Sequence, residues 1–392
     1  MNWHQLISSR RLGKEDRDKH PAEQRTEFQR DYDRLIFSSP FRRMQNKTQV
    51  FPLPGSIFVH NRLTHSLEVS SVGRSLGADV ARALEGKHDA ADSAALESIS
   101  AIVSAACLAH DMGNPPFGHS GEEAICSFFA EGAGQKFRDK LPETTWNDIT
   151  HFDGNANTFR LLTHRFNGRR DGGFVMSYST LASVVKYPFS AALAGNKPKM
   201  GFFTPERDIF LRIFDRLGIP CLEQSGDRIR YARHPLVYLV EAADDICYAL
   251  MDLEDAVSLE LLHARDIEDL LGPLCDPQRL QTAGSLHQRI AMMRGLSIGR
   301  AVSAVADTFI AHHDDLLHGQ LPEHDLLQLC PADIRDTLQA AKKLARERIF
   351  RHRSKLIHEL AAFPCIGSIL DVLIPAVHAQ NTQEGSLQTQ HS

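Results

Sequence analysis

The sequence predicts an all-α fold. Apolar side chains recur every three to four residues along most of the chain, as on one face of a helix, while the alternation typical of half-buried strands is scarce. Hydrophobic residues make up 42% of the 392 residues. This content can fill a large core, and length alone would allow one large domain or two or three ordinary ones.

The predicted helices follow in chain order. The segment 65–80 carries apolar residues near a three-to-four spacing, and 96–110 repeats that pattern. The segment 235–256 begins with Pro235, which suits a first helical turn, and is apolar almost all round, so we expect it inside the bundle. Weaker patterns predict further helices at 28–38, 154–165, 205–216, 258–271, 284–311, 332–350 and 354–373.

Proline, glycine and basic residues gather in the expected loops, which are 51–60, 112–121, 165–175, 187–204 and 217–234. We find no internal repeat. The residues that follow Pro375 are polar and aperiodic, so 378–392 are predicted to form a disordered tail. The remainder, 1–377, is interpreted as a single helical domain.

Composition excludes several classes of protein. A net charge of −5 argues against a general electrostatic nucleic-acid binder, although a local basic patch stays open. The seven cysteines are odd in number and form no CxxC pair, so neither a disulfide framework nor a zinc-thiolate site is indicated. The N-terminus lacks an apolar signal segment, and we expect no uninterrupted apolar run that approaches membrane-spanning length. We expect a cytoplasmic protein.

The stretch from His110 to Glu122, HDMGNPPFGHSGE, is the strongest indication of function. Two histidines and two acids surround a turn rich in glycine and proline, which cannot continue a helix. The charged groups therefore cluster at a helix end. This arrangement is typical of a functional site and not of a core.

Imidazole and carboxylate side chains on or beside predicted buried helices suggest a metal site. They are His65, His110, Asp111 and Asp244, and their donor types suit Mn, Fe, Co, Ni or Zn better than Ca. Asp244 and Asp245 interrupt an apolar helix, where an unpaired carboxylate would be costly to bury. Taken singly, each histidine is more often a cap or a solvated side chain, and the two aspartates could be caps or ion-pair partners.

Other features favour ordinary explanations. Cys107 and Cys247 are interpreted as core residues because their neighbours are apolar. Three basic groups are more often solvated helix faces than phosphate contacts: the pairs Arg42/Arg43 and Arg169/Arg170, and the run from Arg346 to Lys355.

Seven segments together resemble the HD-domain deoxynucleoside triphosphate triphosphohydrolases, with the greatest similarity to the bacterial deoxyguanosine triphosphate triphosphohydrolase (dGTPase) branch. They are NKTQVFPL (46–53), NRLTHSLEVS (61–70), HDMGNPPFGHSGE (110–122), FDGNANTFRLL (152–162), VKYP (185–188), EAADDICYALMDLEDA (241–256) and FRHRSKLIHELAAF (350–363). The resemblance extends from Trp3 to about Ala376. It implies an HD-domain helical bundle with a metal site at its centre and an HD core over about 60–255.

The resemblance implies hydrolysis of a dNTP, with dGTP among the substrates, to the deoxynucleoside and inorganic tripolyphosphate by attack at the α-phosphorus. It implies a divalent metal ion, Mn, Mg, Fe, Co, Ni or Zn, held by His65, His110, Asp111 and Asp244. His119 and Glu122 match the pair beside the scissile phosphate. On a helix that begins near Ser120, their spacing of three residues would place both in one cleft.

The resemblance also assigns substrate contacts. Gln49 and Asp252 match residues near the sugar 3′-hydroxyl, and Tyr248 matches the tyrosine that packs on the deoxyribose. Phosphate contacts are implied for Arg62, Lys186, Tyr187 and Lys199. His151 matches a histidine that is catalytic in some relatives, and the alternative is that it only caps the helix at 154.

Members of this family often form hexamers or other homo-oligomers, and some are activated by dNTPs or single-stranded DNA, so the same partners are expected here. Two other functions stay open. One is another HD-type nucleotidase or phosphodiesterase, which should not need the NPPFGHxGE extension, Tyr248 or Asp252. The other is a non-catalytic nucleotide or nucleic-acid sensor, which should not need His119 and Glu122. The sequence does not determine the preferred base or the native metal.

Overall fold

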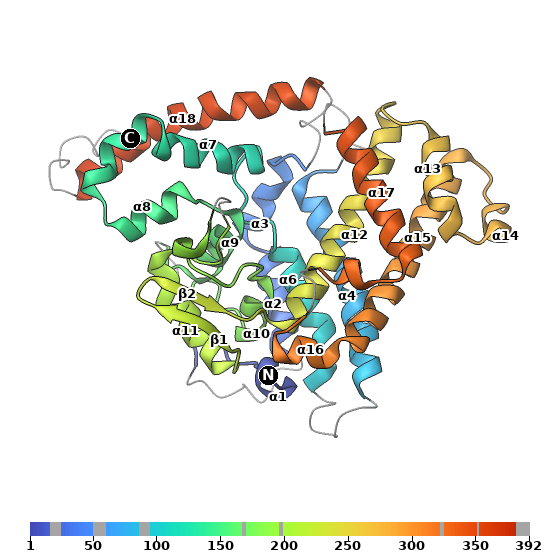
Figure 1. Ribbon diagram of the computed structural model, residues 1–392, viewed down its shortest axis with the longest axis horizontal. Coiled ribbons are helices and arrows are strands. Elements are labelled where there is room, and N and C mark those ends of the chain that lie inside the picture. Colours follow the sequence, from blue (N-terminus) through green and yellow to red (C-terminus); the bar gives the residue numbers. More distant parts are fainter. Residues whose placement is uncertain are drawn as a thin grey trace.

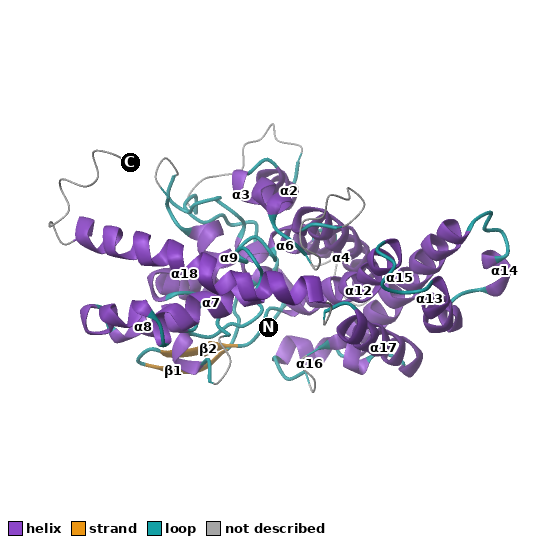
Figure 2. Cartoon of the chain, turned by 90° about the horizontal axis from the view of Figure 1, so that it is seen from above, coloured by secondary structure: helices purple, strands orange, loops and turns teal. Residues whose placement is uncertain are grey.

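The computed structural model describes residues 1–15, 25–49, 60–85, 95–166, 170–195, 199–321, 325–350 and 353–381. Over these residues the chain is built of helices, with one antiparallel two-stranded hairpin at the periphery (Figures 1 and 2). The all-α prediction is confirmed.

The α-helices are α1 (Trp3–Leu6), α2 (Glu27–Ile36), α3 (Ser39–Arg43), α4 (Arg62–Glu85), α6 (Ile99–Ala109), α7 (His119–Ala130), α8 (Glu143–Thr150), α9 (Gly154–Thr163), α10 (Tyr178–Val184), α11 (Arg207–Arg216), α12 (Pro235–Ser258), α13 (Ala264–Leu271), α14 (Pro277–Leu280), α15 (Leu286–Ala311), α16 (His313–His318), α17 (Ala332–Arg348) and α18 (Arg353–Asn381). Short 3-10 helices are η1 (Met44–Asn46), η2 (Ala133–Lys140), η3 (Ala191–Leu193), η4 (Thr204–Glu206), η5 (Gly272–Leu274) and η6 (Leu326–Leu329). The strands are β1 (Cys221–Ser225) and β2 (Arg228–Tyr231).

Helix α12 lies inside the bundle, as its all-round apolar pattern predicts. It packs against α4, α6, α10, α15 and α17. Leu239, Ala243 and Ile246 are fully buried along it. Asp244 therefore projects from an element that is held on several sides.

Helices α4 and α6 approach each other closely because glycines lie at their contact. A Cβ added to Gly73 would come 2.4 Å from the sulfur of Cys107, and one added to Gly77 would come 2.7 Å from the Cα of Ser100. Cys107 is fully buried at this contact, which agrees with its interpretation as a core residue. The close packing brings His65 on α4 beside His110, which follows α6.

All ten predicted helices exist. Where the observed helices differ from the predicted ones in bounds or number, the causes are local. The predicted helix 258–271 begins only at Ala264, because α12 continues to Ser258 and the chain turns at Glu260, whose φ is 59°. Helices α1, α3, α8, α10, α14 and α16 were not predicted, and they span only four to eight residues, too few to show a period. Helix α7, of 12 residues, was expected only as the helix near Ser120 that carries His119 and Glu122.

The predicted loop 217–234 contains the hairpin of β1 and β2. Ile229 and Tyr231 are buried on one face of β2 while Arg228 and Arg230 are exposed, so β2 does alternate with a period of two. A strand of four residues gives too short a pattern to be recognised in the sequence.

Helix α18 corrects two expectations about the C-terminal region. It runs to Asn381 and contains Pro364 and Pro375, so residues 378–381 are helical, while 382–392 lie outside the described residues. A proline removes one backbone hydrogen bond, which a helix of 29 residues tolerates. In addition, Lys355–Gln380 is long and apolar enough to cross a membrane by length and composition, so the expectation that no apolar run approaches that length was wrong. Figure 1 shows α18 lying along α7 at the edge of the molecule.

Candidate active site

The turn after α6 is backed by the first residues of α9. The backbone nitrogen of Gly113 donates to Oγ1 of Thr158 at 2.9 Å, and Nδ2 of Asn157 donates to the carbonyl oxygen of Gly113 at 2.7 Å. A Cβ on Gly113 would lie 2.1 Å from the backbone nitrogen of Thr158. Only glycine fits at this position, which fixes His110 and Asp111 at the helix end.

The second half of the same segment is a strained turn that starts α7. Phe117 and Gly118 both have positive φ, 69° and 59°. This conformation is uncommon for a bulky residue such as phenylalanine and is often found at functional sites. Because the turn ends at Gly118, α7 begins at His119, close to the predicted start at Ser120.

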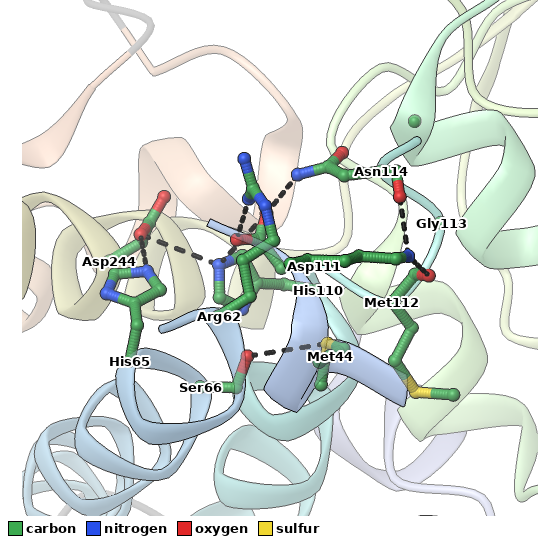
Figure 3. A network of polar contacts seen from close by, with 12 residues as sticks. Met44, Arg62, His65, Ser66, His110, Asp111, Met112, Gly113, Asn114 and Asp244 are labelled. Carbon is green, nitrogen blue, oxygen red and sulfur yellow. Dashed lines mark hydrogen bonds and ion pairs between the residues drawn. The ribbon is translucent and has the colours of Figure 1, made fainter. Parts of the chain in front are cut away.

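The four expected metal ligands converge from three separate helices. One ligand atom each from His65, His110 and Asp111 can be chosen so that all lie within 4.8 Å of one another. Asp244 joins them from α12, with its Oδ1 at 3.0 Å from Nε2 of His65 and 3.5 Å from Nε2 of His110. Figure 3 shows the side chains of His65 and His110 directed toward Asp244.

His110 is oriented as a metal-ligating histidine should be. Its Nδ1 lies 2.6 Å from the carbonyl oxygen of Cys107, to which it donates, so the lone pair is placed on Nε2. That Nε2 is buried and has no hydrogen-bond partner within the described residues. An orphaned nitrogen beside two carboxylates fits a divalent cation, and the N/O donor set suits Mn, Fe, Co, Ni or Zn.

Neighbouring opposite charges keep the acids and His110 of this cluster ionised. Burial acts to raise the pKa of Asp244, but the neighbouring His110 and His65 outweigh it and hold that pKa well below its usual range. Burial likewise opposes ionisation of Asp111, and Arg62 lowers its pKa. For His110, burial is outweighed by Asp111 and Asp244, and the pKa rises to about 9. A bound cation would have to displace that proton.

His119 and Glu122 lie one turn apart on α7 and contact each other. Nδ1 of His119 is 3.0 Å from Oε2 of Glu122, and the Glu122 hydrogen bond raises the pKa of His119. The side chain of His119 is 83% exposed, whereas that of Glu122 is 4% exposed. Glu122 is fixed by a second bond, which its Oε1 accepts from the backbone nitrogen of Gly154 at 2.8 Å. The pair can therefore hold a proton at the wall of the cleft.

A cavity of about 820 Å³ opens over these groups. Its walls come from η1, α4, the 110–119 turn, α9, α10, α12 and α18. Predicted site residues that line it are Gln49, Arg62, His110, Asp111, His119, Lys186, Tyr187, Lys199, Asp244 and Tyr248. His65 lies behind this wall and is 3% exposed.

The predicted phosphate contacts lie on the cavity wall, and each cation has an anionic partner. Arg62 forms an ion pair with Asp111, Lys186 with Glu241 at 3.1 Å, and Lys199 with Asp153 at 3.7 Å. Both lysines also lie over the ring of Tyr187, at 5.6 and 5.7 Å from its centroid. An incoming anion would compete with these carboxylates for the same cations.

Gln49 and Asp252 leave acceptor atoms unsatisfied. Oε1 of Gln49 and Oδ2 of Asp252 are buried and have no partner within the described residues. Asp252 lies one helical turn beyond Tyr248 on α12, is 4% exposed and does not itself line the cavity. Burial, together with nearby Asp255, raises the pKa of Asp252 well above its usual range.

Some cavity residues were missed by sequence reasoning. Phe350 stacks on Tyr248 with ring centroids 5.5 Å apart, and the first turns of α18 contribute Lys355, His358 and Glu359. Lys355 lines the cavity and its side chain is only 20% exposed, so this end of the basic run is not a solvated helix face. The segment 350–363 was singled out only as part of the resemblance, and no local pattern assigns its side chains to a cavity built mainly from residues 46–248.

His151 is not brought to the cavity. Its Nδ1 lies 3.0 Å from the carbonyl oxygen of Asn147 at the end of α8, and it is absent from the cavity wall. The alternative that it caps the helix at 154 was wrong, because Asp153 caps α9 by accepting from the backbone nitrogen of Asn155. Asp245 is paired with Lys342 at 2.7 Å, which supplies the basic partner expected for that acid.

Known proteins are similar to this chain in the HD motif and along nearly the whole of its length. The HD domain model matches residues 62–151. A deoxyguanosinetriphosphate triphosphohydrolase-like protein of Pseudomonas aeruginosa is 40% identical, with 97% of this chain and 86% of the relative covered. One from a Synechocystis species is 37% identical over 99% and 89% of the two chains. A deoxyguanosinetriphosphate triphosphohydrolase of Yersinia enterocolitica is 30% identical over 91% and 78%.

The similarity extends beyond the HD match to helix α12, which carries both Asp244 and Tyr248, so it covers the whole cavity and not only the histidine-aspartate motif. The chain therefore belongs to the deoxyguanosinetriphosphate triphosphohydrolase-like family of HD-domain proteins.

Proposed function

We propose that this protein is a metal-dependent phosphohydrolase that converts a dNTP, with dGTP among its substrates, to the deoxynucleoside and inorganic tripolyphosphate. The observation that carries the proposal is one cavity at whose wall His110, Asp111 and Asp244, backed by His65, converge near the His119 and Glu122 pair. Basic side chains line the same cavity, as a polyanionic substrate requires.

The four ligands would hold a divalent ion such as Mn²⁺ or Mg²⁺. When bound, such an ion polarises a phosphoryl oxygen and lowers the pKa of water. The protein's own contribution is to fix these ligands: α6 and α9 hold the turn, and Arg62 and Asn114 hold the two carboxylate oxygens of Asp111.

His119 would move the proton that hydrolysis requires, either to the departing 5′-oxygen or from the attacking water. Its exposed ring lies at the cavity wall, and Glu122 fixes the ring orientation through Nδ1. The hydrogen bond that His119 donates to Glu122 raises the pKa of His119 and so favours its protonated form.

The remaining contacts suit a deoxynucleotide. Arg62, Lys186 and Lys199 would bind the phosphates, with Tyr187 between the two lysines. Gln49 and Asp252 would bind the 3′-hydroxyl, since a hydroxyl group supplies a hydrogen-bond partner to buried atoms that otherwise lack one. Tyr248, backed by Phe350, would pack against the sugar.

A product assay tests the proposal. The purified protein is incubated with Mn²⁺ or Mg²⁺ and each of the four dNTPs, with GTP as a ribonucleotide comparison, and products are separated by ion exchange. We expect tripolyphosphate and free deoxynucleoside, with both lost in His110→Ala. His287→Ala serves as the matched control, because His287 is exposed on α15, away from the cavity.

The alternatives give different results. Release of orthophosphate or pyrophosphate would indicate another HD-type nucleotidase or phosphodiesterase. Nucleotide binding without turnover, unchanged in His119→Ala, would indicate a sensor.

We also propose that the protein self-associates through the outer face of α18. Large apolar side chains are exposed along this helix, at Leu356, Ile357, Leu360, Ile369, Val372, Leu373 and Val377. Large exposed apolar side chains in this number on one helix are typical of an interface. The resemblance to a family whose members often form homo-oligomers favours a second copy of this chain as the occupant.

A further inference from the structure

Lys47 inserts its ammonium group beneath the 110–114 turn. Its Nζ donates to the carbonyl oxygen of Asn114 at 2.6 Å and to that of Met112 at 3.3 Å. The backbone of Lys47 is itself fixed to α4, because its carbonyl oxygen accepts from the backbone nitrogen of Arg62 at 3.1 Å. The two carbonyl groups that flank Gly113 are therefore attached to the residue that begins α4.

Asn114 continues the connection into the metal cluster. Its Nδ2 donates to Oδ1 of Asp111 at 2.6 Å, while Arg62 binds Oδ2 of the same carboxylate. Figure 3 shows the side chains of Asn114 and Arg62 meeting Asp111. Asp111 is thus oriented through both of its oxygens, and one of them depends on where Asn114 is held.

We propose that Lys47 and Asn114 are positioning residues for Asp111: Lys47 fixes the backbone of Asn114, and the amide of Asn114 fixes the carboxylate that faces the metal. The inference rests on the proposed metal-dependent function. Groups that bond directly to metal ligands commonly contribute 10- to 100-fold to metal affinity, so about that loss is expected here.

Removal of Lys47 distinguishes a positioning role from a purely electrostatic one, because the two roles predict opposite changes in metal affinity. Its half-buried ammonium lies close enough to Asp111 and Arg62 for electrostatic interaction. Removal of a positive charge near a cation site should, by Coulomb's law alone, strengthen metal binding. If the hydrogen bonds of Lys47 position the ligand, its removal weakens binding instead.

The experiment measures the Kd for Mn²⁺ by calorimetry on the chelator-treated full chain, with the melting temperature followed by circular dichroism. We expect Lys47→Met and Asn114→Ala each to weaken Mn²⁺ binding by about 10- to 100-fold, and Lys47→Arg to retain most of the affinity. Because the two residues act in series, the double variant should bind no more weakly than the weaker single variant.

Two matched controls are available. Lys343→Met removes an exposed lysine on α17, and Asn46→Ala removes an exposed asparagine that lines the cavity. Both should bind Mn²⁺ like the unaltered chain. Should Lys47→Met fail to fold, Asn114→Ala decides the question, since this side chain is partly exposed at the cavity wall.

Mn²⁺ affinity equal to or higher than that of the unaltered chain, in a folded Lys47→Met or Asn114→Ala variant, would overturn the inference. So would the absence of Mn²⁺ binding by the unaltered chain. Metal binding does not depend on turnover, so a chain that binds Mn²⁺ but forms no tripolyphosphate would overturn the proposed reaction and leave this inference standing on its own Kd values.

Discussion

At the scale of single residues, the protonation of His119 depends on its hydrogen bond to Glu122. His119→Ala should lower kcat by about 10²- to 10⁴-fold with little change in KM, because a proton-transfer group acts mainly in the transition state. Glu122→Gln removes the carboxylate that raises the pKa of His119. The limb of the pH–rate profile that reports His119 should then move to lower pH.

Glu123→Gln is the matched control for this experiment, since Glu123 is the exposed neighbour on α7. Its pH–rate profile should coincide with that of the unaltered enzyme. An unshifted profile in Glu122→Gln would show that Glu122 does not set the protonation of His119.

The unsatisfied atoms of Gln49 and Asp252 lead to a prediction about the sugar. Asp252→Asn should reduce the preference for dGTP over its 2′,3′-dideoxy analogue by about tenfold or more, because a site built to bond a hydroxyl discriminates against an analogue that lacks it. The measurement is the ratio of the two kcat/KM values. Asp269→Asn, on α13, should leave the ratio unchanged, and an unchanged ratio in Asp252→Asn would remove Asp252 from sugar recognition.

At the scale of elements, the contact of α4 with α6 depends on glycine. Gly77→Ala should destabilise the protein by about 1–3 kcal/mol, because its Cβ would meet the backbone of Ser100 at 2.7 Å and the helices would have to separate. Gly299→Ala on α15 is the opposite case, since no atom lies within 4 Å of the added Cβ. It should stabilise the protein by about 0.5–1 kcal/mol, as alanine does in an exposed helix. Urea denaturation measures both, and equal effects would contradict the packing argument.

His60 connects α4 to α12. Its Nε2 lies 2.8 Å from Glu68 on α4, and its Nδ1 lies 2.7 Å from Asp255 on α12. These two hydrogen bonds raise the pKa of His60 to about 10. His60→Ala leaves two carboxylates without their shared partner and should cost on the order of 3 kcal/mol.

The sign of the pH dependence follows from the raised pKa. The stabilisation by protonated His60 is fully present below its ordinary pKa of about 6.5 and is lost as the pH rises through about 10. The melting temperature should therefore fall more steeply between pH 7 and pH 10.5 in the unaltered protein than in His60→Gln. Parallel curves would show that the bridge is not an ion pair.

At the scale of the whole molecule, α18 presents apolar side chains both to α7 and to the outside. Ala362 and Ile366 are buried, whereas Leu360 and Val372 are 70% and 71% exposed. The double variant Leu360→Glu with Val372→Glu should lower the molar mass measured by light scattering, because charges would face each other across an apolar interface. Gln380→Glu, exposed at the end of the same helix, should not change it. A mass unchanged in the double variant would place the interface elsewhere.

Several features could be predicted from the sequence because they depend on local order. The period of apolar residues located ten helices, and the glycines and prolines of 112–118 located the turn that ends α6. Short elements such as α10 and the hairpin of β1 and β2 were not predicted, because four to eight residues carry too little periodicity. The predicted helix 354–373 stops before Pro375, whereas α18 continues past this proline to Asn381.

The sequence by itself determined the all-α fold, the central place of α12 and, through its resemblance to known enzymes, the set of residues expected at the site. Only the tertiary structure decided which of them share a cavity: it excluded His151 from the wall, buried Asp252 beneath it, and added Phe350 and Glu359 from more than 100 residues farther along the chain than Tyr248. It also showed Lys47 beneath the metal-ligand turn. Helical periodicity is encoded within a few neighbouring residues, whereas a cavity is formed by side chains that meet only after distant helices pack.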